Sequence, residues 1–294
     1  MWAPVGRTLC LLGSALPLQR HQSVRLSAPG EVVGIDLGTT SSAVAVILPR
    51  ADGPPTAEMV PDEAGSTTIP SRVIYRNGGI AVEDGTYIAP TALSSTKRLI
   101  GRTFSEVRDS RPVRALFSDS LLSLPDGSAG LRLSESGRVE ESARDNTPLG
   151  DDDSDDTNKS DDGPVTDARC SPVDVAAALL HALLVRSENM CGVRARRAIV
   201  GVPAHFTEPQ RSATIAAAEQ AGLETVRLLE EPVAAALAYG VGRGAGEELV
   251  LVFDLGGGTL DVSLLRVGGG TAEVLSSSGD AWLGGDDFDI AIAR

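Results

Sequence analysis

Short apolar runs alternate with helix-like segments through the second half of the chain. Each run is rich in Val, Leu and Ile and is bounded by glycine or polar residues, which is typical of strands. Strands joined through helices are expected to lie parallel, whereas strands joined by glycine turns are expected to pair antiparallel. The strands predicted on this basis are 198–202, 226–229, 249–253, 260–266 and 271–276.

Capping signals place helices between and after these strands. Ser171 is a hydroxyl N-cap followed by a proline at the first helical position. Thr207 and Gln210 have the spacing of a capping box. Pro232 opens a third, alanine-rich helix, and a fourth helix is predicted over residues 286–294. This order of elements predicts an α/β fold in which helices cover the sheets.

The first half of the chain carries fewer structural signals. Residues 31–48 have the pattern of a strand, a turn and a second strand. Residues 72–75 and 80–82 are predicted to be two short strands around a glycine turn. Residues 118–168 are weakly patterned, so no element is predicted there.

Two segments have a composition unlike that of a folded core. Residues 1–30 contain three arginines, several serines and no acidic residue, which is typical of a mitochondrial transit peptide. A plastid transit peptide, a secretory signal for the endoplasmic reticulum and an untargeted tail are the alternatives. Asp151–Asp162 contains seven aspartates and no apolar residue. We therefore expect a disordered acidic insertion at about 145–168, with a metal-binding or partner-binding segment as the alternative.

The overall composition limits the classes of function. Apolar residues make up 42% of the 294 residues, which is enough for a sizeable core. The net charge of −14 argues against a nucleic-acid partner, whose phosphates need Lys and Arg. Three cysteines and three histidines are scattered without metal-like spacing, so neither a disulfide framework nor a zinc site is expected. No apolar run approaches the ~20 residues of a membrane span.

One motif occurs twice in the chain. Residues 33–40 and 252–259 both consist of an apolar run, then Asp-Leu-Gly, then small and hydroxyl residues, before a second apolar run. Glycine allows close approach of the backbone to a ligand, and successive N–H groups can cradle phosphate oxygens. Either turn alone could be an ordinary hairpin. The two copies together predict a duplicated domain that holds a phosphate chain between its halves.

Four further features are candidates for chemistry, and each has a plainer interpretation. Lys97 could neutralise a transferred phosphoryl group or be a surface charge. Glu231, next to Pro232, could hold a metal-bound water or cap a helix. Arg211 reads from its own chemistry as a solvent-facing helix residue. The glycines at 284–285 could form another phosphate-approaching turn or a plain loop before a helix.

Six motifs of the chain occur in the order of the DnaK-type, 70-kDa heat-shock chaperones, which the chain therefore resembles. The motifs are Val-Gly-Ile-Asp-Leu-Gly-Thr-Thr (33–40), Thr-Lys-Arg-Leu-Ile-Gly-Arg (96–102), Val-Pro-Ala-His-Phe (202–206), Glu-Glu-Pro-Val-Ala-Ala-Ala-Leu-Ala-Tyr-Gly (230–240), Phe-Asp-Leu-Gly-Gly-Gly-Thr (253–259) and Leu-Gly-Gly-Asp-Asp-Phe-Asp (283–289). The resemblance implies an actin-like, ribonuclease-H-like ATPase domain with two lobes around a nucleotide cleft. The lobes are expected at 31–200 and 201–294.

The resemblance also implies cofactors and site residues. It implies ATP or ADP, Mg²⁺ and usually K⁺. Lys97 is implied as the catalytic lysine, Glu231 as the acid that positions the attacking water, and Asp36 and Asp254 as the carboxylates for the magnesium waters and K⁺. Asp254 is thereby also a catalytic candidate. Residues implied to contact the nucleotide are Gly38, Thr39, Thr40, Gly256, Gly257, Gly258, Thr259, Gly284 and Gly285.

Communication with other domains and partners is implied in the same way. Pro203 and Arg211 resemble the switch pair that passes the nucleotide state toward a peptide-binding domain. The chain ends just after the sixth motif, so an incomplete second lobe is expected. Unfolded polypeptides would then bind through a C-terminal domain absent from this chain. A J-domain co-chaperone and a nucleotide-exchange factor are the implied partners.

The resemblance leaves alternatives open. Residues 278–289 look like the iron–sulfur-assembly branch of the family, beside the general folding branch. His205 stands where an aromatic residue is usual. A small-molecule kinase on the same scaffold, an actin-like filament subunit and an inactive remnant that binds partners are the rival functions.

Overall fold

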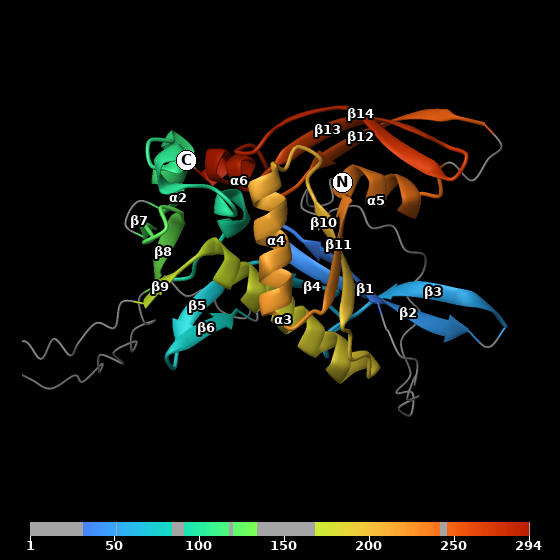
Figure 1. Cartoon of the computed structure of the whole chain (residues 1–294), viewed down its shortest axis with the longest axis horizontal. Coiled ribbons are helices and arrows are strands. Elements are labelled where there is room, and N and C mark those ends of the chain that lie inside the picture. Colours follow the sequence, from blue (N-terminus) through green and yellow to red (C-terminus); the bar gives the residue numbers. More distant parts are fainter. Residues whose placement is uncertain are drawn as a thin grey trace, which may run out of the picture.

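The computed structural model describes residues 32–50, 52–83, 91–117, 120–133, 168–241 and 246–293. The predicted leader at 1–30 lies outside the described residues, as does all but the last residue of the predicted acidic insertion at about 145–168. The described part is a mixed α/β structure, as the alternation of strands and helices predicts (Figure 1).

A mixed sheet forms the centre of the molecule. Its main strand order is β11-β10-β1-β2-β3, and β4 pairs with β2. β1 runs parallel to β10 and antiparallel to β2, and β10 runs parallel to β11. The parallel strands are connected through helices and the antiparallel ones through short turns, as expected. The strands are β1 (Val32–Leu37), β2 (Ser41–Arg50), β3 (Gly53–Met59), β4 (Thr68–Pro70), β10 (Arg197–Val202) and β11 (Thr225–Glu230).

Two helices, α3 (Pro172–Cys191) and α4 (Glu208–Gln220), pack against each other and on this sheet (Figure 1). Both begin at the predicted caps. The side chain of Asp174 accepts the Ser171 amide at 2.7 Å, and the Gln210 side chain accepts the Thr207 amide at 3.1 Å. The core lies between helices and sheet, and its fully buried members include Val33, Val44, Val46, Leu180 and Leu183.

A second, antiparallel sheet has the order β12-β13-β14. Its strands are β12 (Glu248–Leu255), β13 (Leu260–Gly268) and β14 (Thr271–Asp280). Helix α5 (Glu231–Ala238) contacts strands of both sheets, and its Ala236 packs with Leu265 and Val267 in a small second core. Helix α6 (Gly285–Ala293) follows β14. The strand-turn-strand pattern of residues 31–48 therefore has a counterpart at the start of the second sheet.

Several elements of the structure were not predicted from the sequence. Residues 118–168 were left unassigned, but they contain β7 and β8, and β9 starts at residue 168. β3 was missed because it contains two prolines, which suit it only as an edge strand. The remaining elements are β5 (Val73–Arg76), β6 (Gly79–Val82), β7 (Leu121–Ser123), β8 (Ala129–Leu133), β9 (Ala168–Cys170), the 3₁₀ turn η1 (Thr96–Leu99), α1 (Phe104–Val107) and α2 (Arg111–Phe117).

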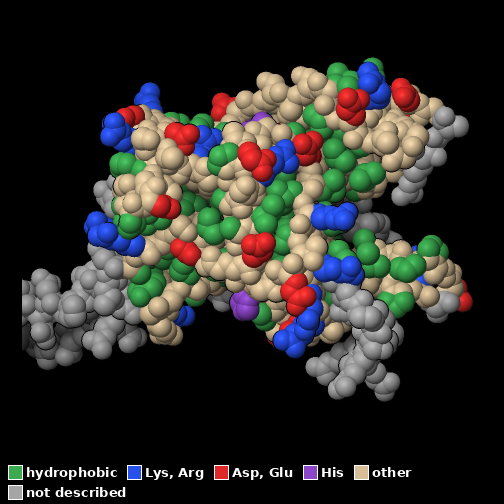
Figure 2. All heavy atoms as spheres, viewed as in Figure 1, with side chains coloured by type: hydrophobic (Ala, Val, Ile, Leu, Met, Phe, Trp, Pro, Cys, Tyr) green, Lys and Arg blue, Asp and Glu red, His purple; other side chains and the backbone are tan. Residues whose placement is uncertain are grey.

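The lobe division at residues 200 and 201 stays a prediction. It falls within β10, and the first sheet continues beyond it into β11. Among the described helices, none is both long and apolar enough to cross a membrane. Figure 2 shows acidic and basic side chains interspersed over one face of the molecule, without a continuous basic stripe.

Candidate functional site

The two repeated motifs form turns that meet. Residues 38–40 connect β1 to β2, and residues 256–259 connect β12 to β13. A Cβ atom added to Gly257 would lie 2.0 Å from Thr40 Oγ1, and one added to Gly258 would lie 2.7 Å from Thr39 Cγ2. Only glycine allows this approach. The two turns therefore face each other from different sheets, as the repeated motif predicts.

The turns present unpaired hydrogen-bond donors. Within the described residues, the backbone amides of Thr39, Thr40, Gly257, Gly258 and Thr259 donate to no other group of the chain. Consecutive free N–H groups in a turn form an anion-binding concavity, and threonine hydroxyls can add to it. The donor set thus fits phosphate oxygens better than it fits a plain hairpin.

Lys97 lies beside the two turns and is paired with Glu231. It is part of η1, and its Nζ atom lies 2.8 Å from Glu231 Oε1 at the start of α5. The Lys97 side chain is only 12% exposed, and its Nζ lies 5.7 Å from the centroid of the Phe206 ring. Burial opposes the charge of Lys97, but the carboxylates of Glu231 and Asp36 outweigh it and raise the pKa of Lys97. Lys97 therefore stays a cation, and its predicted surface alternative is wrong.

Asp36 and Asp254 occupy equivalent positions in the two motifs. Burial, followed by the nearby charge of Glu231, raises the pKa of Asp36 to about 6. Burial and the charges of Glu231 and Asp261 also raise the pKa of Asp254. The charge of Asp254 contributes to the raised pKa of Asp36, so both carboxylates belong to one acidic region of the site. Such a cluster of poorly compensated acids favours a bound cation.

The described residues hold no group of three or more His, Cys, Asp or Glu side chains arranged around one metal position. Mg²⁺ keeps several waters and is commonly held by one or two carboxylates together with substrate phosphates. Asp36 and Asp254, next to the two glycine turns, are therefore the residues that could hold Mg²⁺.

Gly284 and Gly285 support the second turn. The Gly285 amide donates to the Gly256 carbonyl at 3.0 Å, and the Asp286 amide donates to the Gly257 carbonyl at 2.8 Å. A Cβ atom on Gly284 would lie 2.4 Å from the Gly257 backbone. These glycines thus position the turn from the start of α6, and their direct contact with phosphate stays a prediction.

Arg211 lies in a network instead of facing solvent. Its guanidinium donates to Glu230 Oε1 at 2.9 Å and to the carbonyls of Ala204 and Phe206 at 3.3 and 3.1 Å. These carbonyls belong to the turn that Pro203 begins, and Glu230 directly precedes Glu231. Arg211 is therefore connected through Glu230 to the residue next to it, Glu231, which pairs with Lys97. The switch role of Pro203 and Arg211 stays a prediction.

His205 and Asp261 form a second polar pair at the site. His205 Nδ1 lies 2.7 Å from Asp261 Oδ1. This contact with Asp261 raises the pKa of His205, although burial lowers it. Sequence reasoning marked His205 as unusual but gave it no partner, because Asp261 lies on a different strand and no local signal links the two.

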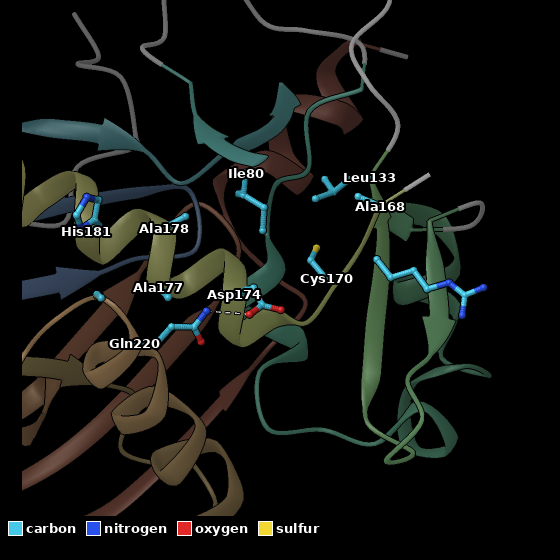
Figure 3. Close-up of a pocket in the computed structure, with 11 residues that line it drawn as sticks. Ile80, Leu133, Ala168, Cys170, Asp174, Ala177, Ala178, His181 and Gln220 are labelled. Carbon is cyan, nitrogen blue, oxygen red and sulfur yellow. Dashed lines mark hydrogen bonds between the residues drawn. The ribbon is translucent and has the colours of Figure 1, made fainter. Parts of the chain in front are cut away.

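A cavity with a volume of about 510 Å³ lies away from the two turns, between β6, β8, β9, α3 and α4. Figure 3 shows Cys170 and Asp174 in its wall, with the Asp174–Gln220 hydrogen bond along one side. Beside Gly38, Thr39 and Lys97 there is a space of only about 10 Å³. The two turns are therefore in contact, and they must separate before a phosphate chain can lie between them.

Comparison with known proteins identifies the family. The model of the family described as "Hsp70 protein" matches residues 32–145 and 149–294. The "Chaperone protein DnaK" of Prochlorococcus marinus is 39% identical over 271 residues, which are 90% of this chain and 36% of that protein. The "Chaperone protein dnaK" of Cyanidioschyzon merolae is 37% identical over 273 residues, or 89% of this chain and 38% of that protein.

Relatives of a second type are similarly close. The "Chaperone protein HscA homolog" of Pseudomonas fluorescens is 37% identical over 269 residues, which are 89% of this chain and 36% of that protein. The chain thus spans less than two fifths of the length of these relatives. The match does not favour a small-molecule kinase. The chain belongs to the Hsp70 family and corresponds to its amino-terminal, actin-like nucleotide-binding region.

Proposed function

We propose that the chain binds ATP between its two glycine turns and hydrolyses it, as the nucleotide-binding region of a protein-folding chaperone. The observation that carries this proposal is the convergence of two free-amide turns on the Lys97–Glu231 pair. An ordinary hairpin needs neither glycines packed against a second turn nor a buried lysine beside them. Membership of the Hsp70 family supports the same conclusion.

The residues of the site have separate tasks in this reaction. The amides and hydroxyls of the two turns hold the phosphate oxygens. Glu231 fixes the Lys97 ammonium, which stabilises the charge on the transferred phosphoryl group and, with Glu231, orients the attacking water. Asp36 and Asp254 would hold Mg²⁺, and K⁺ is proposed at the same carboxylates. Mg²⁺, when bound, neutralises part of the phosphate charge.

The Arg211 network gives hydrolysis a route to the rest of a longer protein. Glu230, which binds Arg211, is the last residue of β11 and directly precedes Glu231 at the start of α5. A movement of Glu231 on hydrolysis would therefore shift the turn at Pro203. We propose that this turn signals to a peptide-binding domain for unfolded polypeptides, with a J-domain co-chaperone and a nucleotide-exchange factor as partners.

The cellular setting belongs to the same proposal. A mitochondrial location is supported by the arginine-containing, acid-free residues 1–30. Bacterial and red-algal relatives are compatible with an organellar origin. The resemblance of residues 278–289 to the iron–sulfur-assembly branch leaves general folding and iron–sulfur assembly as two client classes.

Calorimetry and phosphate release test the proposal on the full chain. We expect MgATP to bind, and hydrolysis to fall by about 100-fold in Lys97→Ala, the effect of removing one electrostatic contact to a transition state. Arg114→Ala, at a 66% exposed side chain, is the matched control and should hydrolyse ATP like the unmodified protein. Absence of MgATP binding in the unmodified chain would contradict the proposal.

A further inference from the structure

Arg98 crosses from the first sheet's side of the site to the second glycine turn. It follows Lys97 in η1, but only 8% of its surface is exposed. Its guanidinium donates to the carbonyl of Gly258, 160 positions later in the chain. The same guanidinium lies 5.1 Å from the centroid of the Trp282 ring, which is a cation–π distance. One side chain therefore joins η1, the second turn and the loop before α6.

The surroundings of Arg98 are built for a cation. Burial lowers the pKa of Arg98, and the nearby charges of Asp287, Asp286 and Asp280 oppose that effect. An arginine remains charged under such conditions. The Gly258 carbonyl and the Trp282 ring contact this buried guanidinium, and the charges of three acids favour its charged form.

The second glycine turn leaves room for the Arg98 guanidinium because residue 258 is a glycine. A Cβ atom on Gly258 would lie 2.6 Å from the Arg98 guanidinium, so any other residue there would displace Arg98 or the turn. The Gly258 carbonyl and the Thr259 amide belong to one planar peptide group and point in opposite directions. Because Arg98 holds the carbonyl, it also fixes the direction of the Thr259 N–H, which is one of the free donors of the site.

We propose that Arg98 is a positioning residue, which holds the second glycine turn, with Trp282 as its backing, in the conformation that receives nucleotide phosphates. This inference rests on the proposed function, because it assigns the turn a phosphate ligand. The contact of Arg98 with the Trp282 ring depends on the planar guanidinium, so lysine is not an equivalent replacement. The role of Arg98 thereby differs from that of Lys97, which faces the transferred phosphoryl group.

Fluorescence and calorimetry on the full chain test this inference. The chain has two tryptophans, so Trp2→Phe leaves Trp282 as the sole emitter. In that background, Arg98→Met should shift the Trp282 emission in nucleotide-free protein, and MgATP affinity should fall about tenfold, as for loss of a charged contact. The MgATP affinity of Arg98→Lys should fall by a similar factor. The exposed-site variant Arg114→Met is the control and should change neither reading.

A second pair of variants covers the case in which Arg98→Met does not fold. Trp282→Phe keeps an aromatic face for the guanidinium and should bind MgATP like the unmodified chain, whereas Trp282→Leu should bind more weakly. Equal affinity for these two variants would overturn the role of Trp282. Unchanged MgATP affinity in Arg98→Met or Arg98→Lys would overturn the positioning role while leaving the proposed function intact. An unmodified chain without MgATP affinity would instead overturn the proposed function itself.

Discussion

The two sheets begin with the same hairpin motif but bury it very differently. In β1, Val33 and Ile35 are 0% and 4% exposed, because β10 pairs along one edge and α3 covers their face. In β12, Leu249 and Phe253 are 68% and 65% exposed, and no other described strand pairs along its second edge. The same strand pattern thus gives a core in one sheet and an open apolar face in the other.

This difference shows that the local geometry of a repeated motif and its contribution to stability are separate properties. The turn geometry is local, so both copies place an aspartate and a set of free amides at the end of a strand. The contribution to stability depends on the neighbouring elements, which the motif does not contain. The first copy should therefore contribute more to the folding energy than the second, although both copies supply free amides to the site.

The largest expected effect comes from the apolar faces of the two strands. Ile35→Ala should lower the free energy of unfolding by about 2–5 kcal/mol, because it leaves a cavity under α3. Leu251→Ala, at a 66% exposed position, should change it by no more than about 0.5 kcal/mol. Urea unfolding followed by circular dichroism measures both. Equal losses would show that the second sheet is covered in solution.

Replacing the aspartate of either motif copy should raise the stability of the chain, whereas Ile35→Ala lowers it. The pKa of Asp36 is raised to about 6 in the folded state, so the folded chain holds its proton more tightly than the unfolded chain. Stability therefore falls as pH rises from about 4 to about 6, and the full cost is present at pH 7. Asp36→Asn should stabilise the chain by roughly 2 kcal/mol at pH 7.

Asp254→Asn tests the same effect at the equivalent aspartate of the second motif copy. Its pKa is also raised, so Asp254→Asn should stabilise at neutral pH too. Both variants should lose MgATP affinity, since each removes a carboxylate from the cation site. Unfolding midpoints at pH 4 and pH 7 measure the effect. A variant that is less stable at pH 7 than the unmodified chain would show that the carboxylate makes a stabilising contact there.

The contact between the two turns predicts a smaller loss. Gly257→Ala brings a methyl group against Thr40, whose exposed side chain can partly move away, so the cost should be roughly 1 kcal/mol. Gly34→Ala is the matched control, because an added Cβ there meets nothing within 4 Å. MgATP affinity should fall in the first variant only. Equal affinities would mean that the turns do not need to approach each other.

Local features of this fold could be predicted from sequence, whereas contacts across it could not. The caps at Ser171 and Thr207 and the twin turns depend on residues within a few positions, so their patterns are readable. The Lys97–Glu231 pair spans 134 positions, and the family resemblance implies a role for each residue but does not predict their contact. The Arg98–Gly258 contact had no such signal, because nothing beside Arg98 indicates a partner in a different sheet. β7 and β8 were missed because short strands are fixed by their pairing with each other and with β9.

The smallest predicted effect concerns the contact between His205 and Asp261. His205 belongs to the turn after β10, and its partner Asp261 lies on β13. Because the folded-state pKa of His205 is raised, its stabilising contribution is full below the unfolded pKa of about 6.5 and is lost as pH rises through the folded value.

His205→Phe should therefore flatten the pH dependence of stability in the window just above pH 6.5, with only a slight change at pH 8. The effect should be small, since the His205 side chain is 37% exposed and solvent screens the pair. Thermal unfolding midpoints between pH 5.5 and 8.5 measure it, and His181→Phe, at an exposed position on α3, is the control. An unchanged pH profile in His205→Phe would mean that the Asp261 contact does not persist in solution and does not help to hold β13 beside the turn after β10.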